Sequence, residues 1–296
     1  DPEMSRGLGD VYKRQVIIGA VLNIVLDPVF IFGFHMGVSG AATATVLSQT
    51  ASCAFVLKTL FGKTVPVRIT FGGYDWRLIR RILTIGFTPF IIIAMDNVMI
   101  ITMNTILQKY GGAARGDLLI TCATIAQSFM LVVTMPLGGI TSGTQAVLAY
   151  NFGAGNTDRV KGAQKYIFIL AAAYTTLLFI LARTVGGLFV RLFTSDPTVA
   201  AEALRAIRIF TLAIIPLAFQ YEIVDGFTGL GQVQVALPLS FFRKGLYFVS
   251  LFLLPAMFGA EAAFFAEPVS DIAGPVVSAI VYIVSMKGIL AKAGEN

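Results

Sequence analysis

Long apolar segments recur along the whole chain, and short polar connections separate them. A helix needs about 17 to 25 apolar residues to cross a lipid bilayer, and each segment reaches that length. Helices and closed barrels are the structures that satisfy all backbone hydrogen bonds in lipid, and these segments lack the alternating pattern of barrel strands. We therefore expect eight membrane-spanning helices, at residues 16–34, 39–57, 83–108, 118–138, 166–185, 209–230, 232–258 and 262–286.

The composition agrees with this pattern. Hydrophobic residues make up 56% of the 296 residues, charged residues make up 13%, and the mean hydropathy is +0.81. Soluble domains contain about 25% charged residues. The chain is therefore predicted to be an all-α polytopic membrane protein that has the lipid bilayer as its surroundings.

The net charge of +6 would by itself be compatible with nucleic-acid binding, but most basic residues lie in the connections between apolar segments. Cytoplasmic connections of membrane proteins carry an excess of Lys and Arg. If residues 58–82 are cytoplasmic, both ends of the chain are cytoplasmic too, and no nucleic-acid partner is expected. The cytoplasmic basic residues are then Lys58, Lys63, Arg68, Arg77, Arg80, Arg81, Arg159, Lys161, Lys165, Lys287 and Lys292, and the external ones are Lys109, Arg115, Arg183, Arg191, Arg205 and Arg208.

The external connections are then residues 109–117 and 186–208, and the second one contains a helix signal. Asp196 is a favourable N-cap residue, and Pro197 suits the first position of a helix. We expect a helix on the membrane surface to begin there and to carry Arg205 and Arg208.

An internal repeat links the two ends of the chain. The stretch GVSGAATATVLSQ at residues 37–49 aligns without gaps on GAEAAFFAEPVSD at residues 259–271. The matching positions are Gly37 and Gly259, Ala41 and Ala263, Ala44 and Ala266, and Ser48 and Ser270. An even number of spans separates the copies, which predicts a parallel repeat, as in transporters built from two like-oriented halves.

The repeat also predicts the domain organisation. If residues 83–290 form a complete lobe of six helices, residues 16–60 are only the last two helices of a first lobe, and about four helices precede them in the complete protein. Residues 61–82, with Trp76 next to basic side chains, would be the cytoplasmic linker and would include a short amphipathic surface helix. Residues 1–15 are polar, match no signal peptide and are interpreted as a non-native segment.

Acidic residues inside the apolar segments are candidates for a transport pathway, because a charged side chain costs about 2.5 to 3.5 kcal/mol at the centre of a membrane helix. They are Asp27, Asp96, Glu222, Asp225 and Glu267, with Asp271 one turn after Glu267. An interfacial anchor, or an ion pair with Arg243, is an equally good explanation of Glu267 and Asp271. Arg243 and Lys244 can equally extend to the cytoplasmic edge of the membrane.

An enzyme is not expected. The sequence has no HExxH, GxSxG or P-loop motif, and its one histidine leaves little for acid–base or zinc chemistry. Acids on different helices would allow an intramembrane aspartyl protease, which explains neither the repeat nor the basic linker. A flippase for lipid-linked oligosaccharides is a closer alternative, but it should line its cavity with arginines that hold pyrophosphate, whereas these spans contain acids.

Two stretches resemble the multidrug and toxic compound extrusion transporters. LNIVLDPVFIFGFHMGVSGAATAT is similar to the fifth and sixth helices of that family, and MPLGGITSGTQAVLAYNFGAGNTDRVKGAQK to the end of its eighth helix and the following loop. The resemblance implies two six-helix lobes that exchange a small-molecule substrate, usually an organic cation, for H+ or Na+. It also implies a monomeric transporter in a bacterial or archaeal cytoplasmic (inner) membrane, with no cofactor other than the coupling ion.

The eighth-helix stretch also has a physical interpretation. Gly138, Gly139 and Gly143 follow Pro136. They predict a kink and a face of small residues where helices approach closely.

The first candidate ion site is centred on Asp27. Asn23 and Asp27 are four residues apart and share a helix face, and Thr45 is expected at the same depth on the next helix. Their oxygen atoms suit Na+, the one metal ion expected here, or a proton. Pro28 predicts a break in the helix that frees a carbonyl group. The resemblance implies that Asn23, Asp27 and Thr45 form the cation site of the first lobe.

The second candidate site lies in the second lobe. The resemblance implies an acid for cation binding at Asp96, and Glu222 or Asp225 is expected to face it across the lobe. Together with Glu267, these residues are the candidate second cation or substrate site.

Overall fold

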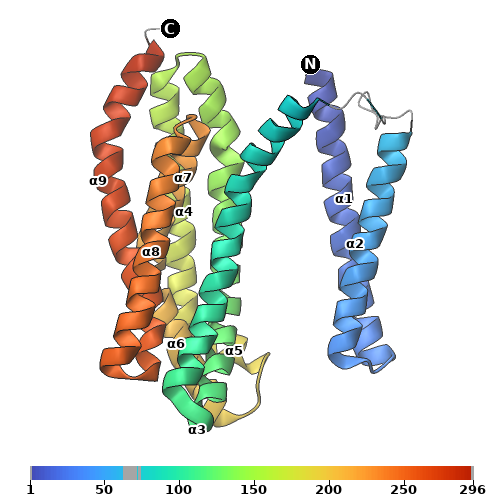
Figure 1. Cartoon of the computed structure of the whole chain (residues 1–296), viewed down its shortest axis with the longest axis vertical. Helices are drawn as coiled ribbons and strands as arrows, with labels where there is room; N and C mark the ends of the chain where they lie inside the picture. The colour runs from blue at the N-terminus through green and yellow to red at the C-terminus, as the bar shows by residue number, and fades with distance from the viewer. Residues whose placement is uncertain (1, 63–71, 73–74, 295–296) are drawn as a thin grey trace. The chain divides into compact units, whose positions relative to one another are not determined.

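The computed structural model describes residues 2–62, 72 and 75–294. Its secondary structure is almost entirely helical, and the described residues contain no strand (Figure 1). Seven helices in this part of the chain are long and apolar enough to cross a membrane: Lys13–Gly33, Gly37–Phe61, Arg115–Gly153, Thr157–Thr184, Pro197–Gly229, Val233–Phe258 and Ala260–Leu290.

These seven helices coincide with seven of the eight predicted spans. The remaining span, residues 83–108, belongs to the first part of α3 (Trp76–Gly153). Several of its side chains, those of residues 84–89 and 92, lie outside the described residues. The all-helical class is therefore confirmed, and the count of eight stays a prediction.

The chain divides into two compact units, Asp1–Thr84 and Ile85–Asn296. The first unit contains α1 (Pro2–Pro28), a π-helix η1 (Val29–Gly33) and α2 (Gly37–Phe61), and α1 and α2 pack side by side (Figure 1). Most of the predicted linker, residues 63–71 and 73–74, lies outside the described residues. Trp76 is the first residue of the long helix α3 and does not start a separate short helix.

Small residues let α1 and α2 approach closely. A Cβ atom on Gly19 would lie 2.6 Å from the Ser52 hydroxyl oxygen, and a Cβ atom on Gly40 would lie 2.9 Å from the carbonyl group of Phe30. Small residues at helix contacts allow the backbones to pack, which is the usual basis of association in lipid. Glycine is therefore required at Gly40, where the close atoms belong to the backbone, whereas the hydroxyl group near Gly19 can rotate away.

The second unit contains the rest of α3 and the helices that follow it. Gly112 (φ 63°, ψ −169°) interrupts α3 and reverses the chain, which is a conformation that glycine adopts without a steric penalty (Figure 1). The following elements are α4 (Thr157–Thr184), α5 (Gly186–Arg191), α6 (Pro197–Phe210), η2 (Thr211–Ala213), α7 (Ile214–Gly229), α8 (Val233–Phe258), η3 (Ala260–Phe265) and α9 (Ala266–Gly294).

The start of α6 agrees with its sequence signal, and its predicted place on the membrane surface stays a prediction. The Asp196 carboxylate accepts hydrogen bonds from the backbone N–H groups of Thr198 and Val199 at 2.7 and 3.3 Å. However, Ile207 and Phe210 are buried in the main apolar core, and η2 joins α6 to α7 in one long span. The apolar face of α6 was long enough to pack inside the bundle, which the polar cap did not reveal.

Charged residues of three connections meet at one end of the second unit. Arg115 forms an ion pair of 2.8 Å with Glu261, and Arg205 forms a second one of 2.8 Å with the same carboxylate. Glu202 lies 3.7 Å from both arginines. The segments predicted to be external are therefore grouped at one end of the bundle.

The two copies of the repeat have matching environments. Ala44 and Ala266 are fully buried, and Ser48 and Ser270 are buried at the next helical turn. Gly37 and Gly259 both have positive φ angles, 56° and 88°. The aligned small residues therefore occupy equivalent positions in two helix pairs.

Candidate functional site

The three residues predicted to hold the coupling ion lie together in the first unit. The amide nitrogen of Asn23 donates hydrogen bonds to Asp27 Oδ1 and to Thr45 Oγ1, each at 3.4 Å. The Thr45 hydroxyl donates in turn to the carbonyl of Ala41 at 3.0 Å. The remaining lone pair of its oxygen and the second Asp27 oxygen are therefore available to a cation or proton. Binding of that ion stays a prediction.

The sequence predicted a break in the helix at Pro28, but the structure shows none there. Helical structure continues as the π-helix η1, in which the N–H of Phe34 donates to the carbonyl of Val29 at 2.9 Å. Proline has no N–H to donate, and a wider turn accommodates this without a full interruption. In place of the predicted break, the helix type changes directly after Pro28.

In the second unit, Asp225 of α7 is held by neutral donors from α3. The hydroxyl of Thr141 donates to one carboxylate oxygen at 2.5 Å, and the amide of Gln145 donates to the other at 2.9 Å. No basic side chain among the described residues forms an ion pair with this carboxylate. Asp225 therefore keeps its negative charge uncompensated when it is ionised.

Glu222 lies one turn earlier on α7 and is 1% exposed. Neither of its carboxylate oxygens has a hydrogen-bond partner among the described residues. The amide nitrogen of the nearby Gln164 likewise has none there, while the amide oxygen of Gln164 accepts from the Tyr282 hydroxyl at 3.0 Å. This group of polar side chains lies between α4, α7 and α9.

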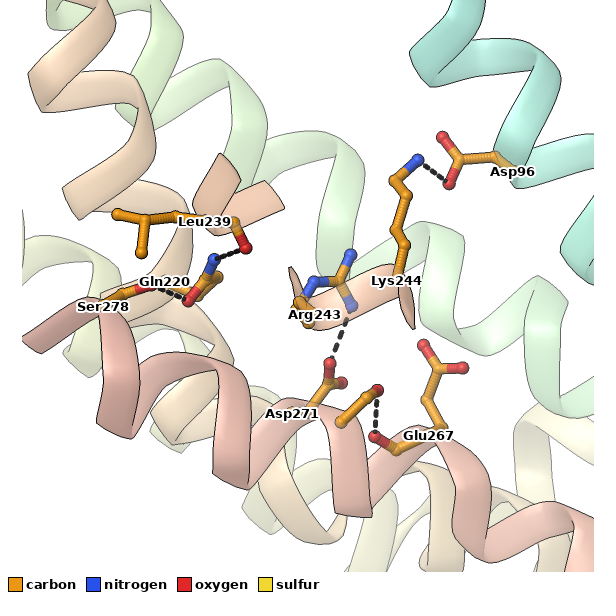
Figure 2. A network of polar contacts seen from close by, with 9 residues as sticks. Asp96, Gln220, Leu239, Arg243, Lys244, Glu267, Asp271 and Ser278 are labelled. Atoms are coloured by element: carbon orange, nitrogen blue, oxygen red, sulfur yellow. Dashed lines mark hydrogen bonds and ion pairs between the residues drawn. The ribbon is translucent and has the colours of Figure 1, made fainter. Parts of the chain in front are cut away.

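Two ion pairs connect α8 with its neighbours (Figure 2). Lys244 donates to Asp96 of α3 at 2.5 Å, and Arg243 donates to Asp271 of α9 at 2.8 Å. The ion pair of Arg243 with Asp271 was one of the sequence interpretations, whereas the ion pair of Lys244 with Asp96 was not predicted. Burial of the charges requires such partners, because an uncompensated charge in a low-dielectric interior is unstable.

Glu267 lies one turn before Asp271 on α9, and its side chain is turned toward α8 (Figure 2). The hydroxyl of Ser270 donates to the backbone carbonyl of Glu267 and does not contact its carboxylate. Among the described residues, the Glu267 carboxylate has neither a hydrogen bond nor an ion pair. It is therefore available to a ligand.

Two cavities meet at these side chains. The smaller one, about 240 Å³, is lined by Asp96, Gln220, Tyr221, Val224, Asp225, Ser240, Arg243 and Lys244. The larger one, about 410 Å³, is lined by Asp96, Tyr221, Arg243, Tyr247 and Glu267 together with apolar, hydroxyl and amide side chains of α3, α6 and α7. Asp96, Tyr221 and Arg243 line both cavities.

The structure therefore brings some predicted residues together and separates others. Asp96 shares the smaller cavity with Asp225 and the larger one with Glu267. Glu222 lines neither of them, because it lies on the side of α7 that faces Gln164.

Sequence reasoning missed the neutral partners of the acids. Thr141 and Gln145 are four residues apart, and this spacing in an apolar segment was the available signal. Gln220 was missed as well. In the structure its amide oxygen accepts a hydrogen bond from the Ser278 hydroxyl at 2.6 Å.

The glycines of α3 do not have the predicted packing role. Among the described residues, no atom lies within 4 Å of a Cβ added at Gly138, Gly139 or Gly143. The close approach in this region is at Gly229, where an added Cβ would lie 3.2 Å from the backbone of Gln145. Small residues were correctly associated with helix contacts, but the prediction placed the contact on the wrong glycines.

Multidrug export proteins of two Staphylococcus species have similar sequences. The multidrug export protein MepA of Staphylococcus aureus (strain MSSA476) is 26% identical over 242 residues, which are 80% of this chain and 52% of MepA. The MepA protein of Staphylococcus haemolyticus (strain JCSC1435) is 24% identical over the same shares of both chains. The chain thus spans about half the length of the curated relatives that it matches.

Solved structures show the same fold. An inward-facing multidrug resistance MATE family transporter of the MOP superfamily has a TM-score of 0.79 at 20% identity, over 93% of this chain and 64% of its own. A MOP superfamily transporter from Pyrococcus furiosus Vc1 has a TM-score of 0.76 at 21% identity, over 93% and 62%. The MatE family model matches residues 93–253, which is more than half of the chain. This match, together with the apolar helices, shows that the chain is part of an integral membrane protein and belongs to the MatE family.

Proposed function

We propose that these residues belong to a cation-coupled antiporter, which exports organic cations, drugs or toxic metabolites in exchange for H+ or Na+. The transporter acts as a monomer in the cytoplasmic membrane of a bacterium or archaeon, without a cofactor other than the coupling ion. Residues 16–60 contribute the last two helices of one lobe, and residues 83–290 form a second lobe of six helices.

The observation that carries this proposal is the larger cavity of the second unit. Its wall combines the flexible side chains of Met99 and Met130 with the rings of Phe210 and Tyr247, and Glu267 supplies a carboxylate. Methionine-rich and aromatic walls adapt to ligands of different shape, and a few polar groups fix the orientation of the ligand. Such a site suits amphipathic cations of varied structure.

A separate observation supports the ion coupling. The amide nitrogen of Asn23 lies 3.4 Å from a carboxylate oxygen of Asp27 and 3.4 Å from the hydroxyl oxygen of Thr45, so carboxylate, amide and hydroxyl groups gather at one place. Oxygen ligands of this kind suit Na+, and a carboxylate can alternatively take up a proton. An ion at Asp27 would therefore compete with the contacts that now join the two helices.

The charges at the cavities argue against the flippase. Arg243 and Lys244 line the smaller cavity, but each forms an ion pair with an acid of the chain. The remaining carboxylates of Asp225 and Glu267 would repel a pyrophosphate group. The same pairs use two of the acids that an aspartyl protease would need, and we propose no enzymatic activity.

The test is transport by the protein encoded by the full reading frame that contains these residues. It is reconstituted in liposomes, a Na+ or H+ gradient is imposed in separate experiments, and the movement of ethidium across the bilayer is recorded. Ethidium should move opposite to the coupling ion under at least one gradient. Absence of movement under both gradients, or movement of a pyrophosphate-linked lipid instead, would contradict the proposal.

A further inference from the structure

The charged groups around the larger cavity do not balance. Arg243 stands opposite two acids of α9 that are one helical turn apart, Glu267 and Asp271 (Figure 2). Its partner in the structure is Asp271, which is fully buried, at 2.8 Å. One guanidinium group and two carboxylates leave a single negative charge in this group.

Asp96 does not add a second free negative charge. Its carboxylate accepts from Lys244 at 2.5 Å, and the Lys244 side chain is only 6% exposed. Water screens the half-exposed carboxylate in part, but the ammonium group of Lys244 lies directly against it and is its countercharge. A cationic ligand would have to displace Lys244 before it could use Asp96.

The carboxylate of Glu267 therefore differs from those of Asp96 and Asp271, which both form ion pairs. It lines the larger cavity and has no hydrogen bond or ion pair among the described residues. Apolar and aromatic side chains, among them Met99, Phe210, Leu217 and Tyr247, form much of the wall of this cavity. A charged group and a wide apolar wall are the two features that an amphipathic cation requires.

We infer that Glu267 is the anchor for the single positive charge of an amphipathic organic cation in the larger cavity, while Lys244 and Arg243 keep Asp96 and Asp271 from that role. The inference rests on the proposed function and assigns its substrate contact to one residue. It also gives Glu267 a position equivalent to that of Thr45, with which it aligns in the internal repeat. The two copies of the repeat then carry different tasks, ion coupling at Thr45 and substrate binding at Glu267.

The experiment measures equilibrium binding of tetraphenylphosphonium to the purified protein, without any ion gradient. This probe carries one positive charge and no hydrogen-bond donor, so its affinity reports on the countercharge and the apolar wall. Glu267→Gln should weaken binding at least about tenfold, as expected for the loss of one partly buried charge contact. Binding of the neutral triphenylphosphine oxide should change much less.

Two further variants separate a binding role from a structural one. Glu267→Asp keeps the charge and should recover part of the affinity, whereas the matched control Glu202→Gln, at the end of the bundle, should bind as the wild type does. The double variant Asp96→Asn with Lys244→Met removes a neutral pair and should lose less affinity than Glu267→Gln. Elution of each variant as a monodisperse peak checks that it is folded.

The possible failures are distinguishable. If the wild type binds the probe and Glu267→Gln binds it equally well, the inference is overturned while the proposed function stands. A larger loss in the double variant than in Glu267→Gln would also overturn it, because Asp96 would then be the anchor. If the wild type binds no organic cation and transports none, both the proposed function and the inference fail.

Discussion

Lys244 Nζ lies 2.5 Å from Asp96 Oδ1, although 148 residues separate the two side chains along the sequence. The pair is asymmetric, because the Lys244 side chain is 6% exposed and that of Asp96 is 53% exposed. Removal of Asp96 and removal of Lys244 should therefore change the stability of the protein by different amounts. A half-exposed carboxylate can be hydrated in place of its partner, whereas a buried ammonium group cannot.

We expect Asp96→Asn to destabilise the protein more than Lys244→Met does. The first change removes a countercharge from a buried cation and should lower the free energy of unfolding by about 1 to 3 kcal/mol. The second leaves a carboxylate that water can reach. Chemical unfolding in detergent, followed by circular dichroism, measures both values, and the double variant should be more stable than Asp96→Asn alone. Equal losses in the two single variants would show that the asymmetry in exposure has no energetic effect.

The ion pair of Arg243 and Asp271 is predicted to depend on Gly274. A Cβ atom on Gly274 would lie 2.8 Å from Cγ of Arg243, so Gly274→Ala should push the arginine away from Asp271. Asp271 is fully buried, and its second carboxylate oxygen already has no hydrogen-bond partner among the described residues. Overpacking of this kind costs about 1 to 3 kcal/mol in the free energy of unfolding.

Gly245→Ala is the matched control for this substitution. Gly245 lies on α8, and no described atom is within 4 Å of an added Cβ. Replacement of a helical glycine by alanine at an open site is neutral or stabilises by up to about 1 kcal/mol. In thermal unfolding, the midpoint temperature of Gly274→Ala should therefore fall. The midpoint temperature of Gly245→Ala should rise or stay unchanged. A Gly274→Ala variant as stable as the wild type would mean that Arg243 can move without losing Asp271.

The sequence of an apolar helix specifies contacts within that helix and with its neighbour along the chain. The contact of Asn23 with Asp27 was predictable because both belong to one helix, and four residues bring side chains onto the same face. The contact with Thr45 was predictable because only a short turn separates the two neighbouring helices. Local geometry was sufficient in both cases.

The partners of Asp96 and Asp225 were not predictable in the same way. A helix that is apolar on all sides gives no signal for its rotation about its own axis. The direction in which Asp96 points was therefore open, and its contact with Lys244 depends on how α3 and α8 pack. The same uncertainty concealed the pairing of Asp225 with Thr141 and Gln145.

Asp27 is predicted to be essential for ion coupling. In the full-reading-frame protein, Asp27→Asn should abolish ethidium movement driven by the ion gradient, because the amide cannot take up a proton and is a weaker ligand for Na+. Membrane insertion should be normal, since the asparagine is nearly isosteric and the site is only half-buried. Fluorescence-monitored transport and the amount of protein in the membrane fraction are measured together.

Two substitutions test the specificity of this effect. Thr45→Val should weaken coupling and Thr45→Ser should retain it, because only the hydroxyl group accepts the hydrogen bond of Asn23. Asp158→Asn removes a carboxylate that is 99% exposed and should have no effect on transport. Wild-type transport by Asp27→Asn under the same gradients would remove Asp27 from the coupling mechanism.

The membrane orientation of the second unit is predicted to place residues 109–117 outside and the connection between α3 and α4 in the cytoplasm. One long apolar helix, Arg115–Gly153, lies between these two connections, so they should be on opposite sides of the membrane. Single cysteines at Ala113 and Asp158 report on the two sides, because both residues are exposed. Gly112 and Gly155 are less suitable positions, since their φ angles of 63° and 70° disfavour any other residue.

In a background with Cys53→Ser and Cys122→Ala, an impermeant maleimide should label Ala113→Cys in intact cells and Asp158→Cys only after permeabilisation. Labelling of both positions from one side would contradict a single crossing between them, and the reverse pattern would mean that the excess of basic residues in the connections does not set the orientation.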